Sequence, residues 1–100
     1  MTVDSRIYMF ATFQAKPERR DELLGRLLEM VKLTHQEPGC VFYHLHVDRD
    51  SSNIFHFMEC WEDQAALDFH MNTPYIKAIV SDAPDLTTSG IDIRFMNRVG

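Results

Sequence analysis

The sequence predicts an α+β, ferredoxin-like fold, β-α-β-β-α-β, in which helices cover one face of a four-stranded antiparallel sheet. Two β-prone segments, Cys40–Val47 and Ile54–Trp61, are separated by a short polar stretch, which is typical of a hairpin. One helical pattern precedes this hairpin and another follows it. A further strand-like segment lies near each end of the chain, which completes the split βαβ order.

Length and charge limit the classes of protein to which the chain can belong. It has 100 residues, and we expect residues 1–100 to form a single domain with a hydrophobic core. Ten Lys and Arg against fifteen Asp and Glu leave a net charge of −5, which disfavours nucleic acid as a partner. The uncharged apolar runs are shorter than the roughly 20 residues that cross a bilayer, so we expect no membrane partner.

The expected compartment is the cytoplasm. The first ten residues have neither a basic region nor a small-residue cleavage site, so they do not resemble a signal peptide. Cys40 and Cys60 do not form a C-x-x-C motif, and we expect both to be reduced thiols. No phosphate-binding glycine motif or G-x-S-x-G motif occurs in the sequence, which disfavours phosphate-cradling and serine-triad chemistry.

The first half of the chain predicts a strand followed by a helix. Residues 7–13 are nearly all apolar and β-prone, and Pro17 suits the first turn of a following helix. Within residues 18–34 the apolar positions recur every three or four residues: Leu23, Leu27, Met30, Val31 and Thr34. This spacing predicts an amphipathic helix, which Pro38 and Gly39 end.

The second half predicts a broken helix and a last strand. Residues 62–71 begin with acidic side chains, which favour the positive end of a helix. Pro74 interrupts this segment, and a helical pattern resumes over residues 75–80. We expect a loop over residues 81–90. Residues 91–95 alternate apolar and charged side chains, as a strand near a sheet edge does.

The hairpin places one carboxylate on an aromatic face. Because side chains alternate along a strand, one face of the second hairpin strand carries Phe55, Phe57, Glu59 and Trp61. A turn centred near Asp50 and Ser51 would pair Tyr43 with Phe57, His44 with His56 and Cys40 with Cys60.

Glu59 and His70 are the candidate catalytic residues. A carboxylate among aromatic rings must be paired, hydrogen-bonded or protonated, because desolvation disfavours its charged form. Glu59 is therefore either a structural acid bonded to a neighbouring element or a reactive one. His70 on the second helix suits a general base or a hydrogen-bond donor, and the alternative is a helix-end histidine bonded to a carbonyl.

Three further histidines share the opposite face of the hairpin. His44, His46 and His56 could converge on a metal ion, but buried or interfacial histidines are the favoured interpretation, and we expect no metal site. The same face carries Phe42, Ile54 and Met58, and the predicted helices leave it uncovered. A second copy of the chain would bury these side chains, so we expect a homodimer.

Two motifs carry a family resemblance. They are E-P-G-C-V-F-Y at residues 37–43 and F-x-E-x-W-E-D-x-A-A-L-x-x-H-x-x-T-P-Y at residues 57–75. The chain resembles the antibiotic-biosynthesis monooxygenase family of dimeric α+β barrels. The resemblance implies a homodimer with a ligand pocket between sheet and helices in each subunit.

By position, the resemblance implies that Glu59, Trp61, His70 and Tyr43 face this pocket. Tyr75 stands where many relatives have a second histidine. The expected activity is a cofactor-independent monooxygenation of a small quinol or polycyclic phenol by O₂, with His70 as base and Glu59 as its orienter or as an acid. The rings of Trp61, Tyr43, Phe57 and Tyr75 would hold the substrate.

Two other functions stay open. One is an isomerase or other proton-shuttling enzyme acting on a small oxygenated metabolite, whose phosphate, if present, would meet Lys32 or Lys77. The other is a dimer that binds a small molecule without turnover. Heme degradation is disfavoured, because Phe10 and Val80 stand near the positions where heme-degrading relatives carry asparagine and histidine.

Overall fold

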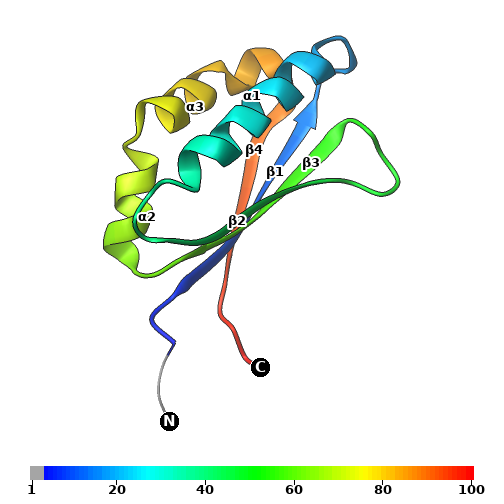
Figure 1. The fold of residues 1–100 in the computed structure, drawn as a ribbon. Coiled ribbons are helices and arrows are strands. Elements are labelled where there is room, and N and C mark those ends of the chain that lie inside the picture. The colour runs from blue at the N-terminus through cyan, green and yellow to red at the C-terminus, as the bar shows by residue number, and fades with distance from the viewer. Residues whose placement is uncertain (1–3) are drawn as a thin grey trace.

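In a computed structural model that describes residues 4–100, four antiparallel strands form one sheet and the helices cover one of its faces (Figure 1). The elements in chain order are β1 (Ile7–Ala15), the 3₁₀ turn η1 (Pro17–Arg19), α1 (Arg20–Thr34), β2 (Cys40–Val47), β3 (Ile54–Trp61), α2 (Gln64–Met71), α3 (Pro74–Leu86) and β4 (Thr87–Met96). The strands are arranged β2-β3-β1-β4. The ferredoxin-like α+β fold is therefore confirmed.

Helices α1 and α3 lie side by side over the sheet, and α2 lies beyond one end of α1 (Figure 1). The start of β1 and the end of β4 lie at the same end of the sheet (Figure 1). None of the helices within residues 4–100 is long and apolar enough to cross a membrane. The interpretation of the first ten residues concerns in part residues 1–3, which lie outside the described residues.

The hairpin strands have the predicted bounds, but the loop predicted at residues 81–90 is wrong. Helix α3 continues to Leu86, and β4 begins directly at Thr87. Pro84 removes one intrahelical hydrogen bond, yet Ala83 and Leu86 on either side are buried and keep the last turn on the core. The Thr87 hydroxyl then donates to the carbonyl of Ala83, which closes this helix end.

The predicted hairpin register differs from the observed one by two residues. The amide of Asp48 donates to the carbonyl of Ile54, so the turn is centred on Ser51. As a result Tyr43 lies opposite Glu59, and His56 lies opposite His46 instead of His44. A shift of two keeps every side chain on its predicted face, because the side-chain period of a strand is two.

A second irregularity separates the two cysteines. The register changes between Cys40 and Phe42, so that Cys40 lies opposite Trp61, and Phe42 lies opposite Cys60. The predicted pairing of Cys40 with Cys60 across the hairpin is therefore wrong. Both side chains are free thiols.

The hydrophobic core lies between the sheet and the helices. Strand β1 contributes Met9, Ala11 and Phe13, which alternate with side chains on the other face. Leu23 and Leu27 of α1 are fully buried against them.

The other face of the sheet, which we call the open face, has no helix over it. It carries Phe10, Phe42, Met58 and Met96, all of them partly or largely exposed.

Candidate functional site

His70 lies near the end of α2, facing the sheet. Asp63 begins this helix by accepting a hydrogen bond from the amide of Ala66. Thr73 begins α3 and donates through its hydroxyl to the carbonyl of His70 at 2.7 Å. These contacts fix the start and the end of α2, and His70 is only 2% exposed. The ring is therefore kept in one place by the packing and by the caps of two helices.

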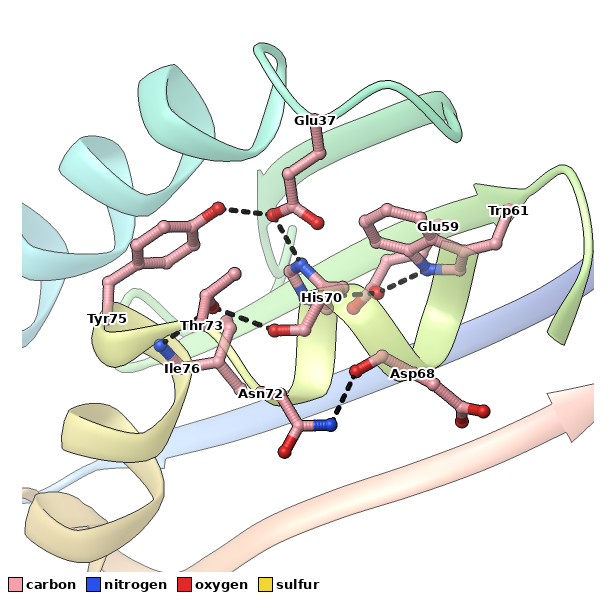
Figure 2. Close-up of polar contacts among 9 residues, drawn as sticks. All are labelled: Glu37, Glu59, Trp61, Asp68, His70, Asn72, Thr73, Tyr75 and Ile76. Atoms are coloured by element: carbon pink, nitrogen blue, oxygen red, sulfur yellow. Dashed lines mark hydrogen bonds and ion pairs between the residues drawn. The ribbon is translucent and has the colours of Figure 1, made fainter. Parts of the chain in front are cut away.

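Glu37 is the partner of His70, and sequence reasoning did not select it. Its Oε2 atom lies 2.8 Å from His70 Nδ1, and the Tyr75 hydroxyl donates to the same oxygen (Figure 2). An ionised carboxylate only accepts hydrogen bonds, so this contact places the imidazole proton on Nδ1 and leaves Nε2 as an acceptor. Burial raises the pKa of Tyr75 to about 12, and the hydrogen bond to Glu37 adds to this, so the phenol stays a donor.

The turn that carries Glu37 touches α2 directly. Gly39 lies so close to Ala66 that an added Cβ would overlap the Ala66 side chain. The amide of Glu62 also donates to the Gly39 carbonyl at 3.0 Å. The E-P-G turn and the start of α2 are thus in backbone contact, which sets the separation of Glu37 and His70.

Glu59 lies on the other side of the imidazole. Its Oε1 atom is 4.0 Å from His70 Nε2, too far for a hydrogen bond, and accepts one from Trp61 Nε1 at 3.1 Å. The residue is 4% exposed. Burial raises the pKa of Glu59 to about 7, and the charge of Glu37 also raises it, whereas the Trp61 hydrogen bond lowers it. Glu59 therefore exists in both protonation states near neutral pH.

Aromatic side chains enclose His70. The Trp61 ring is tilted against it with centroids 4.3 Å apart, and the Tyr43 ring meets it edge-on at 5.4 Å. This burial lowers the pKa of His70, although the hydrogen bond to Glu37 opposes the shift. The effect favours a neutral imidazole, the form that can accept a proton.

A cavity of about 40 Å³ begins at this cluster and runs outward between α3 and β4. Its polar lining consists of Tyr43, Glu59 and His70, and the other lining side chains are apolar. Val80 of α3 and Ile93 of β4 line the outer part and are 50% and 39% exposed, so they mark the mouth. The two titratable groups at the inner end, Glu59 and His70, would meet a ligand that enters here.

The structure brings together most of the predicted site. His70, Glu59, Tyr43 and Phe57 line the cavity. Trp61 does not line it and instead supports Glu59 and His70 from behind. Tyr75 does not line it either, because its hydroxyl lies beyond Glu37 (Figure 2).

The structure adds Glu37 to this set. The orienting carboxylate at Nδ1 is Glu37, and Glu59 lies on the Nε2 side. A carboxylate directly before Pro-Gly in a turn is the available signal, but no pattern in the sequence places that turn beside α2.

The three histidines of the open face do not assemble a metal site. His44 lies opposite Met58, and both ring nitrogens of His56 are engaged, Nε2 with Asp48 at 2.8 Å and Nδ1 with Thr12 at 3.0 Å. Among residues 4–100, no group of three His, Cys, Asp or Glu side chains is close enough to hold a metal ion.

The fold and this cluster define a small α+β protein with a buried histidine between two carboxylates. Residues 6–82 match the model of the family described as antibiotic biosynthesis monooxygenase. The chain belongs to that family.

Named relatives and a solved structure are similar over most of the chain. An uncharacterized protein of Synechocystis sp. is 32% identical over 91% of this chain, which spans only 62% of that protein's length. The Bacillus subtilis protein named "Putative monooxygenase YcnE" is 30% identical over 87% of this chain and 92% of its own. The crystal structure of PA3566 from Pseudomonas aeruginosa superposes with a TM-score of 0.89 at 29% identity, covering 100% of both chains.

Proposed function

We propose that the protein is a cofactor-independent monooxygenase that oxidises a small quinol or polycyclic phenol with O₂. The observation that carries this proposal is the contact between Glu37 and His70 Nδ1, which leaves Nε2 as a buried acceptor beside the cavity. Family membership supports the reaction class, and the apolar walls of the cavity support an aromatic substrate.

His70 is the general base in this proposal. A phenol whose hydroxyl points toward the inner end of the cavity would donate its proton to Nε2, and the resulting imidazolium would be stabilised by the Glu37 carboxylate at Nδ1. Tyr75 is a positioning residue, because its hydroxyl donates to Glu37 and does not reach the cavity.

The substrate supplies the electrons. Its anion gives one electron to O₂, and the radical and superoxide combine at a free ring carbon ortho or para to the oxygen, forming a C–O bond and a peroxide. The peroxide takes a proton and the ring carbon loses its hydrogen as a proton. The O–O bond then breaks, which leaves a carbonyl in the product, and the departing hydroxide takes the proton from the His70 imidazolium and leaves as water. One oxygen atom enters the product, and the phenol becomes a quinone.

Glu59 is the proposed acid for the peroxide. It lines the cavity on the Nε2 side of His70, and its raised pKa of about 7 keeps part of it protonated at neutral pH. Trp61 donates to Oε1 and so fixes the orientation of the carboxyl group. Glu59 would give its proton to the peroxide and recover one from the ring carbon.

The cavity does not favour the alternative of a phosphorylated substrate. Within residues 4–100 no lysine or arginine lines it, and Lys32 and Lys77 are both absent from its walls. A phosphate in this site would therefore be desolvated without a cationic partner.

Oxygen uptake by metal-stripped protein tests the proposal, with menadiol and a panel of naphthols as substrates. We expect uptake above the protein-free blank, and a loss of at least ~100-fold in kcat for His70→Asn. His56→Asn on the open face is the matched control and should retain the wild-type rate. Wild-type uptake equal to the blank across the panel would reject the proposal, and co-purification of a stable unreacted ligand would then favour a binding protein.

We also propose that two copies pack through their open faces. Phe10, Phe42 and Met58 leave an apolar surface there, and Arg94 and Asp92 flank it with opposite charges. Sedimentation equilibrium at micromolar concentration should give about twice the 11.7 kDa chain mass. Met58→Glu should shift this value toward the monomer, and a wild-type protein that sediments as a monomer would refute the packing.

A further inference from the structure

The cavity is much smaller than the ligand that the proposed function requires. Its volume is about 40 Å³, whereas an apolar cavity that holds one benzene molecule measures roughly 150 Å³. A naphthol therefore enters only if part of the wall moves. Only a wall side chain with open space on its other side can make this movement.

Most of the wall is fixed. Phe57 and Tyr43 are fully buried and packed ring against ring at 4.6 Å, and Ile79 of α3 is equally buried. Met9 lies on the sheet beneath them and is also buried. Displacing any of these side chains would disturb the close-packed core.

Met30 of α1 is also buried, at 5% exposure, but unlike those side chains it has a groove on its other side. It lines the cavity, and it also lines a groove of about 170 Å³ on the outside, between α1 and α3. Tyr75 and Ala78 form the opposite wall of that groove. A rotation of the Met30 side chain into the groove would enlarge the cavity without moving a helix.

Met71 has solvent on its other side. It is the last residue of α2, it lines the cavity, and it is 38% exposed. Val80 and Ile93 at the mouth are exposed as well, so Met71 can turn outward past them. Methionine suits such movement because it is unbranched and has three rotatable bonds.

We propose that Met30 and Met71 form two movable walls of the cavity, and that their displacement determines which planar, uncharged aromatic rings can enter. This inference rests on the proposed function for the class of ligand, but it concerns binding and not turnover. It assigns a specificity role to two side chains that take no part in the proton transfers.

Methionine-methyl NMR tests the movement directly. Protein labelled with ¹³C at the methionine methyl groups is titrated with 2-naphthol under argon, where no oxidation can occur. We expect the signals of Met30 and Met71 to shift, while Met58 and Met96 on the open face stay unchanged. Binding of 2-naphthol with the Met30 and Met71 signals unshifted would overturn the inference, and so would the absence of binding.

Paired substitutions test the role of side-chain flexibility. Leucine and isoleucine have as many side-chain heavy atoms as methionine, but isoleucine is branched at Cβ and is stiff at χ1. We expect Met30→Ile and Met71→Ile to weaken 2-naphthol binding about tenfold relative to Met30→Leu and Met71→Leu, and to weaken phenol binding less. Equal affinities of the Ile and Leu variants, at equal melting temperatures, would overturn the inference.

The two proposals fail in different ways. If 2-naphthol binds with the expected shifts but no quinol or naphthol is turned over, the monooxygenase proposal fails and the movable walls remain. If turnover occurs but the methionine signals do not shift on binding, the movable walls fail and the monooxygenase proposal remains.

Discussion

The protein contains two histidine–carboxylate pairs of the same length in opposite surroundings. His70 Nδ1 lies 2.8 Å from Glu37 on the helix-covered face, where both side chains are less than 5% exposed. His56 Nε2 lies 2.8 Å from Asp48 on the open face, where the side chains are 32% and 31% exposed. The two pairs therefore have the same contact distance but differ in how strongly water screens their charges.

Burial strengthens the electrostatic interactions of the first pair, because little water screens them. Water screens the His56–Asp48 pair, so this pair contributes little to stability. At His70 the desolvation lowers the imidazole pKa, and the same desolvation raises that of Glu59. The surroundings of a pair, and not its contact distance, therefore distinguish the candidate site.

The largest expected effect comes from breaking the buried pair. Glu37→Ala leaves both His70 Nδ1–H and the Tyr75 hydroxyl without their acceptor. We expect it to lower the free energy of unfolding by about 3 to 5 kcal/mol, because each unpaired buried donor costs about 1 to 3 kcal/mol. Asp48→Ala, the exposed counterpart, should leave urea unfolding within the scatter of replicates. Glu37→Gln keeps an acceptor and should lie between the two. Equal losses in Glu37→Ala and Asp48→Ala would show that burial does not separate the pairs.

The second effect is a pH dependence from Glu59. Its folded pKa of about 7 exceeds the ordinary 4.5. The native state therefore loses stability as pH rises from 4.5 to about 7, and above pH 7 the loss of stability is complete. Glu59→Gln cannot ionise. The difference in free energy of unfolding between Glu59→Gln and the wild type should therefore change in favour of Glu59→Gln by on the order of 3 kcal/mol between pH 5 and pH 8. Exposed Glu29→Gln is the control, and a constant gap between Glu59→Gln and wild type would contradict the raised pKa.

A smaller effect is expected from Tyr75→Phe. The substitution removes one donor to a buried carboxylate, which should lower the free energy of unfolding by about 1 to 2 kcal/mol. Tyr8→Phe is the matched control, because the Tyr8 hydroxyl bonds to Asp4 in an exposed position. In ¹⁵N spectra of Tyr75→Phe, His70 should keep its proton on Nδ1. A switch to Nε2 would mean that Glu37 alone does not fix the tautomer.

The smallest effect concerns acid unfolding through Asp48. The hydrogen bond from His56 lowers the pKa of Asp48, so any stability that it contributes is present above its ordinary pKa and is lost as pH falls through the lowered one. Asp48→Asn should shift the acid-unfolding midpoint slightly upward at low salt, and 0.5 M NaCl should abolish the difference. A shift in the acid-unfolding midpoint that persists in 0.5 M NaCl would show that this pair is not screened and behaves like a buried pair.

The sequence could predict which face of the sheet each strand side chain occupies. Side chains alternate with a period of two, so a register that is wrong by two residues leaves every side chain on the same face. The aromatic face with Glu59 and Tyr43 was found in this way, although Tyr43 proved to lie opposite Glu59 itself. The length of α3 could not be predicted, since Pro84 is a helix-breaking signal that only the burial of Ala83 and Leu86 overrides.

Glu37 shows why the partner of His70 could not be found from the sequence. The two residues are 33 positions apart, and their contact depends on the close approach of Gly39 to Ala66. Periodicity describes single elements, whereas this contact joins a turn to a helix. The two family motifs contain one of these residues each, and they give neither the atoms in contact nor the tautomer.

The contact between Gly39 and Ala66 also bears on how such a protein can change over evolution or in the laboratory. Position 39 has no room for a side chain, so a substitution there would displace the turn that carries Glu37. The mouth is formed by α3 and β4 instead, where Val80 and Ile93 are largely exposed and can be exchanged at little cost in stability. The Glu37–His70 contact and the mouth therefore lie in separate parts of the chain, and a library confined to the mouth would alter the entrance while this contact stays the same.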